Sequence, residues 1–534
     1  MKHPDSSFLD GLNESQKQAV TATDGHLLIV AGPGTGKTLT IVRRIAHLVN
    51  QGVSPEKILA VTFTNRAARE MKERTESFLG RHSNNLFIGT FHLLGLKILK
   101  QFMQDDFVIC DRDGQMNILK EILKGTKAKA HDAAERISRI KNFLEDRDAE
   151  INTVYEAYQS ALAAKSALDF DDLILKPIDM FQDEAVLKQY QDMFSHIIVD
   201  EYQDINPAQY RLLKLLAGDK AYVCAVGDSD QAIYAFRGAD IENFLNFEKD
   251  FKGAKTIALT QNYRSTGAIL NASGSMIKNN LKRIEKNLTP AKNSGNSINI
   301  VSVPDERAEG EIIVKEIDAR MGCTSHYNLY AKGASTVCEG SYGFSDFAVI
   351  FRTNAQANAV EEVFMESGIP YQVIGRKNLR QRKEIEDTIS YMKSIIDPSG
   401  EAGKEQSASL EETLLSDDDL FDPKANTVTL MTMHMAKGLE FRVVFIAGAE
   451  DGLIPYTLNK DSADIEEERR LFYVGMTRAK DELFLLHSRS RFLYGQKLNQ
   501  PASPFLKEIP KDLVHSMVVS DRMIKDKKKQ IGLF

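Results

Sequence analysis

The chain has 534 residues, of which 43% are hydrophobic, and a formal net charge of −7 at pH 7. This length can bury large apolar cores, so we expect two or more domains. No stretch approaches the roughly 18 apolar residues of a membrane-spanning helix, and residues 1–10 lack the apolar core of a signal peptide, so we expect a soluble cytoplasmic protein. The negative charge argues against a uniformly basic nucleic-acid binder but is compatible with a local basic groove.

The first predicted element of chemical interest is a strand, a glycine-rich turn and a helix. Apolar residues 27–31 precede the turn AGPGTGKT at 31–38, and apolar side chains after it recur at helical spacing. Glycines permit backbone angles that let N–H groups converge on phosphate oxygens at the positive end of the helix. Lys37 is expected to reach the β and γ phosphates of a nucleoside triphosphate, and the Thr38 hydroxyl to join a magnesium shell. The residues expected to bind the phosphates are Gly32, Gly34, Thr35, Gly36, Lys37 and Thr38.

Two adjacent carboxylates, Asp200 and Glu201, follow the apolar run 196–199. A buried strand ending there would place them at the edge where open α/β sheets bind ligands. Asp200 could then hold magnesium, and Glu201 could orient and deprotonate an attacking water. The alternative, a solvated acidic corner, is disfavoured by the apolar run that precedes the pair.

Strand-like apolar runs fall into two successive sets separated by helical patterns. The first set lies at 27–31, 58–63, 86–90, 197–200, 221–227 and 256–260. The second set lies at 298–303, 347–352, 371–375, 428–433, 442–447 and 482–487. We therefore expect an α/β fold with two mostly parallel sheets, each flanked by helices. Between the early strands, residues 103–168 are charged, Ala-rich and poor in strand patterns, which predicts a helical insertion.

Long motifs outside the phosphate loop resemble those of superfamily 1 DNA helicases of the UvrD, Rep and PcrA type. The clearest are VGDSDQAIYAFRGAD at 226–240, VTLMTMHMAKGLEF at 428–441 and EERRLFYVGMTRAKDEL at 467–483. The resemblance runs from residue 12 to about residue 508, with the motifs in family order. It implies two RecA-like P-loop NTPase domains that use ATP and Mg²⁺.

The resemblance also implies a domain layout. The first RecA-like domain would comprise 1–102 and 170–262, with a helical insertion at 103–169. The second would comprise 263–396 and 427–510, with an acidic linker at 397–426 in place of the large insertion called subdomain 2B. Residues 511–534 would form a flexible basic tail.

Roles at the nucleotide are implied residue by residue. Gln16 matches the family's adenine-reading glutamine, whose amide suits the adenine N6 and N7 edge. Tyr263 matches the aromatic that stacks on the base, and Glu440 a carboxylate near the ribose. The catalytic set would add to Glu201 the γ-phosphate sensor Gln231 and two clamping arginines, Arg264 and Arg478, which neutralise charge in the transition state.

Residues that grip single-stranded DNA are implied in the same way. Aromatic faces stack on any base, which gives sequence-tolerant binding. Tyr234 and Phe236 are the best candidates, whereas Phe91 could equally be a core aromatic. The full set is Phe63, Thr64, Asn65, Thr90, Phe91, His92, Tyr234, Phe236, Arg237 and His434.

This chain departs from its relatives in three places. Phe236 stands where many have Trp, and Leu39 where several have an Arg that contacts the nucleotide base, so base discrimination is expected to be looser. The third departure is the missing 2B subdomain: residues 397–423 carry nine acids and one Lys, a composition that forms a linker rather than a packed domain. Its loss could remove a brake on unwinding or weaken the grip on duplex DNA.

Two segments stand outside the helicase pattern. Residues 322–345 resemble an added surface loop, in which Cys323, His326 and Cys338 make a poor metal site because a fourth ligand is missing. The tail ends in QIGLF, where Gln530, Leu533 and Phe534 resemble a short peptide by which bacterial replication and repair proteins bind the sliding clamp. The alternative is that these residues pack onto the rest of the chain.

The sequence therefore predicts an ATP-dependent DNA helicase or translocase that moves 3′ to 5′ on single-stranded DNA and at single-strand/duplex junctions, in DNA repair or replication. The expected setting is the bacterial cytoplasm, at the nucleoid. The alternative function is a DNA-stimulated ATPase that removes proteins or remodels DNA without separating strands.

Overall fold

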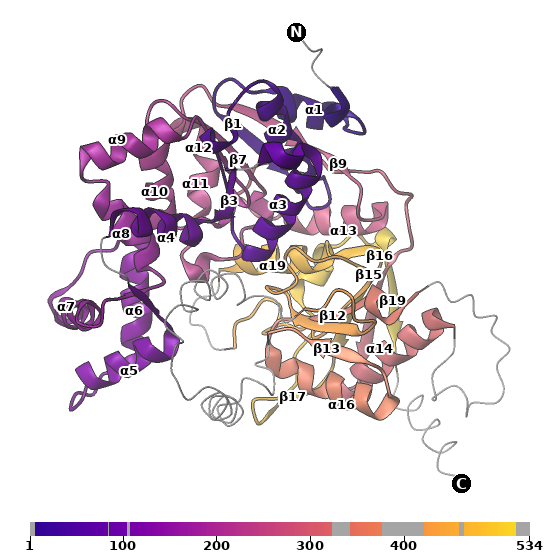
Figure 1. Cartoon of the computed structure of the whole chain (residues 1–534). Coiled ribbons are helices and arrows are strands. Elements are labelled where there is room, and N and C mark those ends of the chain that lie inside the picture. The colour runs from indigo at the N-terminus through magenta and orange to yellow at the C-terminus, as the bar shows by residue number, and fades with distance from the viewer. Residues whose placement is uncertain are drawn as a thin grey trace, which may run out of the picture. The chain divides into compact units, whose positions relative to one another are not determined.

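The structure is a computed structural model, described here for residues 6–83, 85–103, 107–322, 342–375, 421–458 and 464–519. The chain divides into two compact units (Figure 1). Unit 1 contains residues up to Gly32 and the range Gly36–Leu259, and unit 2 contains Pro33–Thr35 and the described residues from Thr260 onward. Among the described residues, no helix has the length and apolar character needed to cross a membrane.

Unit 1 is built on a six-stranded parallel sheet of order β3-β2-β6-β7-β1-β8. β1 and β2 are buried along their whole length, which explains their continuous apolar sequences. The strands lie within one residue of their predicted positions. They are β1 (Leu27–Ala31), β2 (Ile58–Thr62), β3 (Phe87–Thr90), β6 (His196–Val199), β7 (Tyr222–Gly227) and β8 (Lys255–Leu259).

Helices cover this sheet with apolar faces at helical spacing. In α2 (Lys37–Asn50), for example, Ile41, Ile45 and Leu48 share a buried core with Leu27 and Ile29 of β1. The other helices of eight or more residues are α1 (Glu14–Thr21), α3 (Asn65–Leu79), α4 (Phe91–Phe102), α8 (Asp172–Met180), α9 (Glu184–Met193) and α10 (Pro207–Ala217).

Three further helices of unit 1 form a group beside the sheet (Figure 1). They are α5 (Arg112–Ile122), α6 (Ala130–Phe143) and α7 (Ala149–Ala163). They have a core of their own, in which Leu119, Ile137 and Tyr158 are buried. Two short strands that the sequence did not predict, β4 (Val108–Cys110) and β5 (Ala167–Asp169), pair at the two ends of this segment.

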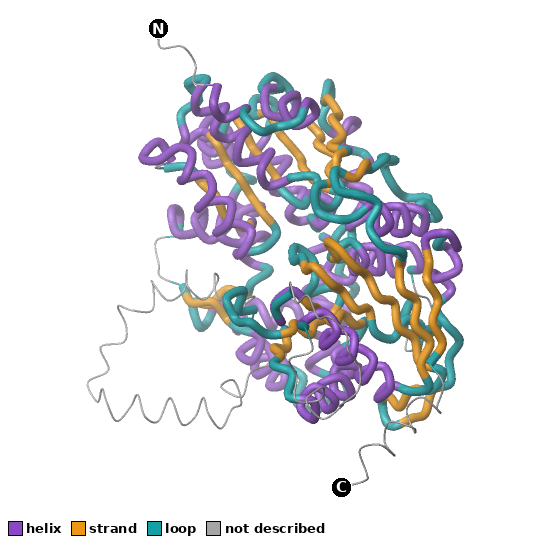
Figure 2. Tube along the Cα trace, turned by 90° about the vertical axis from the view of Figure 1, so that its right-hand side faces the viewer, coloured by secondary structure: helices purple, strands orange, loops and turns teal. Residues whose placement is uncertain are grey.

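Unit 2 is built on a seven-stranded parallel sheet of order β13-β14-β12-β15-β16-β11-β19, whose strands run side by side with helices against them (Figure 2). The prediction of two mostly parallel sheets flanked by helices is confirmed. The strands are β11 (Ile298–Val303), β12 (Phe347–Phe351), β13 (Tyr371–Val373), β14 (Val428–Thr432), β15 (Phe441–Ile446), β16 (Ala479–Ser488) and β19 (Val514–Val518). The longer helices are α13 (Gly267–Ile277), α14 (Glu306–Met321), α16 (Ala357–Ser367) and α19 (Ile465–Met476).

The strand β19 corrects one prediction. Residues 511–534 were expected to form a flexible tail, but Lys511–Leu513 form a 3₁₀ turn and Val514–Val518 pair in parallel with β11. The basic composition concealed a short strand at the edge of the sheet, in which His515 and Ser516 separate Val514 from Met517 and Val518.

Candidate functional site

The turn between β1 and α2 requires glycine at two positions. Gly34 has φ +67° and Gly36 has φ +83°, both in the left-handed region. A Cβ at Gly36 would lie 2.8 Å from Nε2 of Gln16, and one at Gly34 would lie 2.5 Å from Cβ of Arg264. Any larger residue would strain the backbone and collide with a neighbour. The turn therefore presents backbone N–H groups at the N-terminus of α2, an arrangement that binds phosphate.

Gln16 is held beside this turn by the cap of α1. The Asn13 side chain accepts the N–H of Gln16 at 2.9 Å, and Oε1 of Gln16 accepts the N–H of Asn13 at 3.0 Å. This reciprocal capping box fixes the side chain and places its Nε2 against Gly36. The structure thus brings Gln16 to the phosphate loop, and its role in reading adenine stays a prediction.

Lys37 and the two acidic residues meet at the same edge of the sheet. Nζ of Lys37 lies 3.1 Å from Oε1 of Glu201, and both side chains are partly exposed, at 14% and 22%. Asp200 is buried, with Oδ1 accepting the N–H of Glu201 at 2.9 Å. A cation suited to phosphate and a carboxylate suited to activating water are therefore in direct contact.

Glu201 adopts an unusual backbone conformation. Its φ and ψ are 51° and 42°, in the left-handed region that non-glycine residues avoid at a cost of about 1 kcal/mol or more. Its Oε2 accepts a hydrogen bond from Nε2 of Gln203. Strain at a residue whose carboxylate faces Lys37 is typical of a functional position.

Two buried residues that the sequence analysis did not single out connect Glu201 to Gln231. Gln203 donates to Glu201 and accepts the N–H of Asp228 at 3.0 Å. Asp228 in turn accepts from Nε2 of Gln231 at 2.7 Å. Asp228 lies inside the motif at 226–240 and Gln203 follows Glu201 by two residues, but only the burial and the contacts show that they link two predicted catalytic residues.

The oxygen donors at this edge suit magnesium. Thr38 lies in the first turn of α2 and Asp200 directly follows β6, and because β1 and β6 belong to one parallel sheet, both loops lie at its carboxyl edge. Hydroxyl and carboxylate oxygens are ligands that Mg²⁺ prefers. The described residues include no group of three or more His, Cys, Asp or Glu that could hold a metal alone. Magnesium would therefore need phosphate oxygens or water as further ligands, which is its usual mode of binding.

Unit 2 gathers a second group of predicted residues. Nε of Arg264 lies 2.7 Å from Oε2 of Glu440, and Lys480 pairs with the other oxygen of Glu440 at 2.7 Å. Although burial acts to raise the pKa of Glu440, these two cations lower it below its usual value. Arg264 also donates to the carbonyl of Thr477 at 3.3 Å, the residue before Arg478. Arg264, Glu440 and the chain at Arg478 thus lie together.

The other two residues of this group differ in exposure. Arg478 is buried, and its guanidinium donates to the carbonyls of Val474 and Leu439 at 2.9 and 3.2 Å. Tyr263 is 44% exposed, and its hydroxyl donates to Gln261 at 2.9 Å. An exposed ring is what stacking on a base requires, whereas Arg478 is held in place by main-chain carbonyls.

Three of the aromatic side chains expected to bind DNA lie together in unit 1. The rings of Phe63 and Tyr234 stack at 4.7 Å with an interplanar angle of 23°. Tyr234 also contacts Phe236 at 5.9 Å, and the guanidinium of Arg237 lies 5.5 Å from the Tyr234 ring and 5.6 Å from the Phe236 ring. Phe236 is 60% exposed. An exposed aromatic ring beside a guanidinium suits a nucleic-acid base and its backbone.

Two predicted DNA contacts are helix caps. The hydroxyls of Thr64 and Thr90 accept N–H groups of Ala67 and Leu93, both at 3.2 Å, and so begin α3 and α4. Asn65 is the first residue of α3. These positions fix loops at the carboxyl ends of β2 and β3, and their contact with DNA stays a prediction.

The sequence left Phe91 as either a DNA-stacking or a core aromatic, and the structure favours the core. His92 beside it has different surroundings. Phe91 is 4% exposed, so its ring packs in the core and offers no face to a base. His92 is half-buried. Burial of its ring lowers its pKa to about 4, so the ring is neutral near pH 7. It makes an edge contact with the Phe170 ring at 6.3 Å. In unit 2, His434 is half-buried in the loop after β14.

The surroundings of Leu39 are apolar, and several other predictions concern residues outside the described part of the chain. Leu39 packs beside Phe8, Leu12 and Val20, so an apolar cluster occupies the position where several relatives place a cation. Cys323, His326, Cys338, most of the acidic linker 397–426 and the tail residues Gln530, Leu533 and Phe534 lie outside the described residues.

Two family models match the chain. The model of the UvrD/REP helicase N-terminal domain matches residues 12–252, and the model of the UvrD-like helicase C-terminal domain matches 257–407 and 403–490. The two C-terminal matches meet at 403–407, inside the predicted acidic linker.

Several similar curated proteins carry the same description. The ATP-dependent DNA helicase PcrA of Staphylococcus aureus (strain NCTC 8325) is 34% identical over 658 residues, covering 96% of this chain and 88% of the relative. The protein of the same description from Staphylococcus epidermidis (strain ATCC 12228) is 35% identical over 672 residues, covering 98% and 90%. The first alignment is 658 residues long and this chain has 534, so at least 124 positions of that relative have no counterpart here.

Proposed function

The chain belongs to the UvrD/REP helicase family, and we propose that it is an ATP-dependent DNA helicase that moves 3′ to 5′ along single-stranded DNA. The observation that carries this proposal is the contact of Lys37 with Glu201 at the phosphate loop, with Asp200 beside them. Repair or replication of DNA is the cellular setting that we propose.

In the proposed reaction, the phosphate loop and Lys37 hold the phosphates of ATP. Lys37 exchanges its contact with Glu201 for the phosphates, which leaves the Glu201 carboxylate to accept a proton from water. That water attacks the γ phosphorus as the bond to the β–γ bridging oxygen breaks, giving ADP and phosphate. Bound magnesium, held with Thr38 and Asp200, would neutralise phosphate charge.

Unit 2 supplies the proposed response to ATP. Arg264 and Arg478 would bind the γ phosphate, with Gln231 sensing it from unit 1, and Arg264 would leave Glu440 to do so. Glu440 would then be available to the ribose, and the exposed Tyr263 ring to the base. Loss of the γ phosphate would release the arginines, so that each cycle alternates the grip on DNA.

The proposed grip uses the exposed aromatic group of unit 1. Phe63, Tyr234 and Phe236 would stack on successive bases, with Arg237 near the backbone, each stacked base contributing about 1–3 kcal/mol. Asn65, Thr64, Thr90, His92 and His434 would line the strand. Binding by stacking and backbone charge is tolerant of sequence, as movement along DNA requires.

We propose the same domain layout as the sequence indicates, with the acidic linker 397–426 in place of subdomain 2B. The support is the position at which the two C-terminal matches meet and the positions of the relative that this chain lacks. The same observation favours a second candidate function: an ATPase that translocates and removes proteins from DNA without separating strands.

Unwinding assays separate the two candidates. Purified full-length protein is given a duplex with a 3′ tail, a duplex with a 5′ tail, and single-stranded DNA carrying a bound protein, with Lys37→Ala as the control. Strand separation on the 3′-tailed duplex alone is expected for the helicase. ATP hydrolysis and protein displacement without separation would reject it in favour of the second candidate, and separation on the 5′ tail would reject the polarity.

The peptide QIGLF at 530–534 carries a separate proposal, that it binds a sliding clamp through Gln530, Leu533 and Phe534. Lysines precede it, and a terminal Leu-Phe pair suits an apolar groove on a partner. Deleting 530–534 should abolish clamp binding while ATPase activity is kept. Equal clamp binding by the deleted and full-length proteins would refute it.

A further inference from the structure

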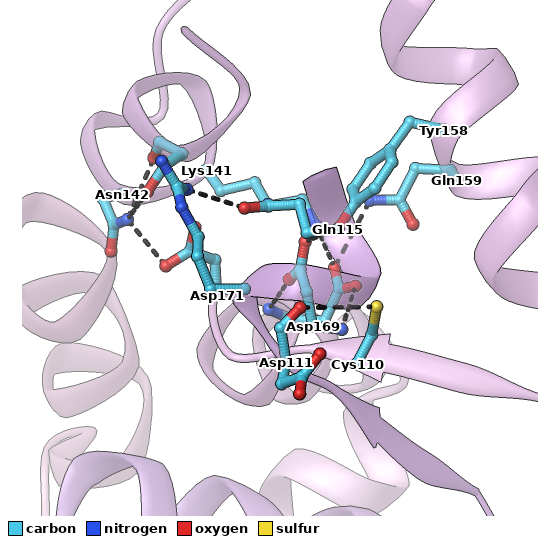
Figure 3. A network of polar contacts seen from close by, with 12 residues as sticks. Cys110, Asp111, Gln115, Lys141, Asn142, Tyr158, Gln159, Asp169 and Asp171 are labelled. Atoms are coloured by element: carbon cyan, nitrogen blue, oxygen red, sulfur yellow. Dashed lines mark hydrogen bonds and ion pairs between the residues drawn. The ribbon is translucent and has the colours of Figure 1, made fainter. Parts of the chain in front are cut away.

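A buried ion cluster fixes helix α6 to the chain that follows the inserted helices. Nζ of Lys141 in α6 lies 2.7 Å from Oδ2 of Asp169 and 2.8 Å from Oδ1 of Asp172. The Tyr158 hydroxyl donates to the same oxygen of Asp169 at 3.0 Å (Figure 3). The Lys141 and Asp172 side chains are wholly buried and that of Asp169 almost so. A buried cation between two acids holds its helix in one position, since any shift would leave charges unpaired.

The next residue along α6 reaches the loop that carries Glu201. Nδ2 of Asn142 donates to Oδ1 of Asp171 at 2.9 Å, and its Oδ1 accepts from Nδ2 of Asn206 at 2.7 Å (Figure 3 shows Asn142 directed at Asp171). Asn206 is buried and caps α10. It ends the segment 200–206, the ATP-site loop, which begins with Asp200 and Glu201.

Phe143, the last residue of α6, reaches the loop that carries the exposed aromatic residues. A Cβ at Gly238 would lie 3.0 Å from the Phe143 ring and 3.5 Å from Cβ of Asn206, so only glycine fits there, with φ +93°. Gly238 directly follows Tyr234, Phe236 and Arg237, and we call 234–238 the aromatic loop. A backbone hydrogen bond also ties the ATP-site loop to the chain just after the aromatic loop, since the carbonyl of Ile205 accepts the N–H of Asp240 at 3.2 Å.

We propose that the C-terminal end of α6 couples the two loops: Asn142 positions the ATP-site loop and Phe143 the aromatic loop, so that DNA on the aromatics accelerates hydrolysis at Glu201. Lys141 anchors this helix end. The inserted helices thus serve the timing of hydrolysis, beyond any contact that they make with DNA. This inference rests on the proposed function and adds the route by which DNA regulates its ATP site.

The hydrogen bond between Asn142 and Asn206 can be removed from either side. Asn142→Ala removes this bond together with the side chain's hydrogen bonds to Asp171 and to the carbonyl and hydroxyl of Ser138. Asn206→Ser keeps a hydroxyl that can cap α10 but removes the amide donor to Asn142. The matched control is Asn117→Ala, at an exposed position of α5 in the same group of helices.

The expected result is a split in the kinetics. Each of the two variants should keep its ATP KM and its hydrolysis rate without DNA within about twofold, whereas kcat at saturating single-stranded DNA should fall about tenfold, by analogy with residues coupled at about 1–2 kcal/mol. The double variant should lose no more than Asn142→Ala alone, because both substitutions remove the same bond between Asn142 and Asn206. Asn117→Ala should match the wild type in every measurement.

A merely structural role predicts a different pattern. Folded Asn142→Ala and Asn206→Ser proteins, matched by circular dichroism, would then show a lower Tm and wild-type stimulation by DNA, which overturns the inference alone. Additive losses in the double variant would also overturn the shared bond. A wild-type protein that hydrolyses ATP no faster with DNA than without it would overturn the proposed function and this inference together.

Discussion

Two lysines of unit 1 are paired with carboxylates at nearly the same distance, yet their surroundings differ. Lys37 meets one carboxylate, that of Glu201, at 3.1 Å, with both side chains partly exposed and the backbone of Glu201 strained. Lys141 meets two, at 2.7 and 2.8 Å, with no exposure of its own. Although burial acts to lower the pKa of Lys141, its two acids raise it. The exposure of the lysine and the number of its carboxylate partners therefore distinguish the two pairs. Lys37 is suited to exchanging its partner, whereas Lys141 fixes a helix.

The largest expected effect is on hydrolysis at the exposed pair. Lys37→Ala should lower DNA-stimulated ATPase activity by about three orders of magnitude, because charge on the transferred phosphoryl group is no longer neutralised. Stability should change by less than about 1 kcal/mol, since the pair is partly solvated. Steady-state ATPase assays and urea denaturation measure the two effects.

Lys127→Ala, at an exposed position of unit 1, is the control. If the ATPase activity of Lys37→Ala stays within tenfold of the control, the contrast drawn between Lys37 and Lys141 is wrong.

The buried cluster should respond in the opposite sense. Lys141→Met leaves two adjacent acids without a cation and should destabilise unit 1 by about 3–5 kcal/mol. Urea denaturation followed by circular dichroism measures this loss, with Lys120→Met at an exposed position of α5 as the control.

Neutralising the whole cluster sharpens the same test. Combining Lys141→Met with Asp169→Asn and Asp172→Asn should recover much of the stability, because the unpaired charges are gone. A triple variant less stable than Lys141→Met would mean that burial of unpaired charge is not the cause.

A smaller effect is expected from the strained backbone at Glu201. Glu201→Asn and Glu201→Gln should both abolish most hydrolysis, because both lose the base. Asn tolerates the left-handed conformation better, so Glu201→Asn should be more stable than Glu201→Gln by about 0.5–1 kcal/mol. Thermal unfolding of the two proteins in parallel measures the difference, and equal Tm values would argue that the strain costs little.

The smallest effect concerns pH and His92, whose ring touches Phe170 between two acids of the buried network. Burial lowers its pKa from 6.5 to about 4. The unfolded chain therefore binds a proton at His92 as the pH falls below about 6.5, whereas the folded chain binds it only near pH 4. Because the unfolded state binds the proton first, the stability contributed by the neutral ring is lost as the pH falls through that window. His92→Gln should show a shallower fall of Tm between about pH 6.5 and 4.5, and an identical slope would contradict the pKa shift.

The sequence predicted the sheets well for a physical reason. Strands buried on both faces, such as β1, are continuous apolar runs, and Lys37 and Glu201 follow the carboxyl ends of such strands, so their roles could be predicted from the chain itself. Gln16 lies in α1, and its role was predicted from the family resemblance alone. The sequence shows less clearly which side chains of a helix are buried. The sequence left Phe91 open between a stacking and a core aromatic because nothing local shows which face of α4 points inward.

Hydrogen bonds and ion pairs between residues far apart in the chain could not be predicted from the sequence either. Lys141 and Asp169 are 28 positions apart, and Gln203 and Asp228 are 25 positions apart. No periodic pattern relates residues at such separations. β19 escaped prediction because His515 and Ser516 interrupt its apolar residues, and its pairing with β11 depends on a partner more than 200 residues earlier.

That last pairing bears on how the chain folds as it is synthesised. The sheet of unit 1 needs nothing after Leu259, whereas β11 gains its neighbour β19 only when Val514–Val518 have left the ribosome. One side of β11 therefore stays unpaired through more than 200 residues of translation, a period in which an exposed strand edge can associate with other chains. Shortening the gene before codon 514 would thus be expected to yield a product with an intact phosphate loop and a strong tendency to aggregate.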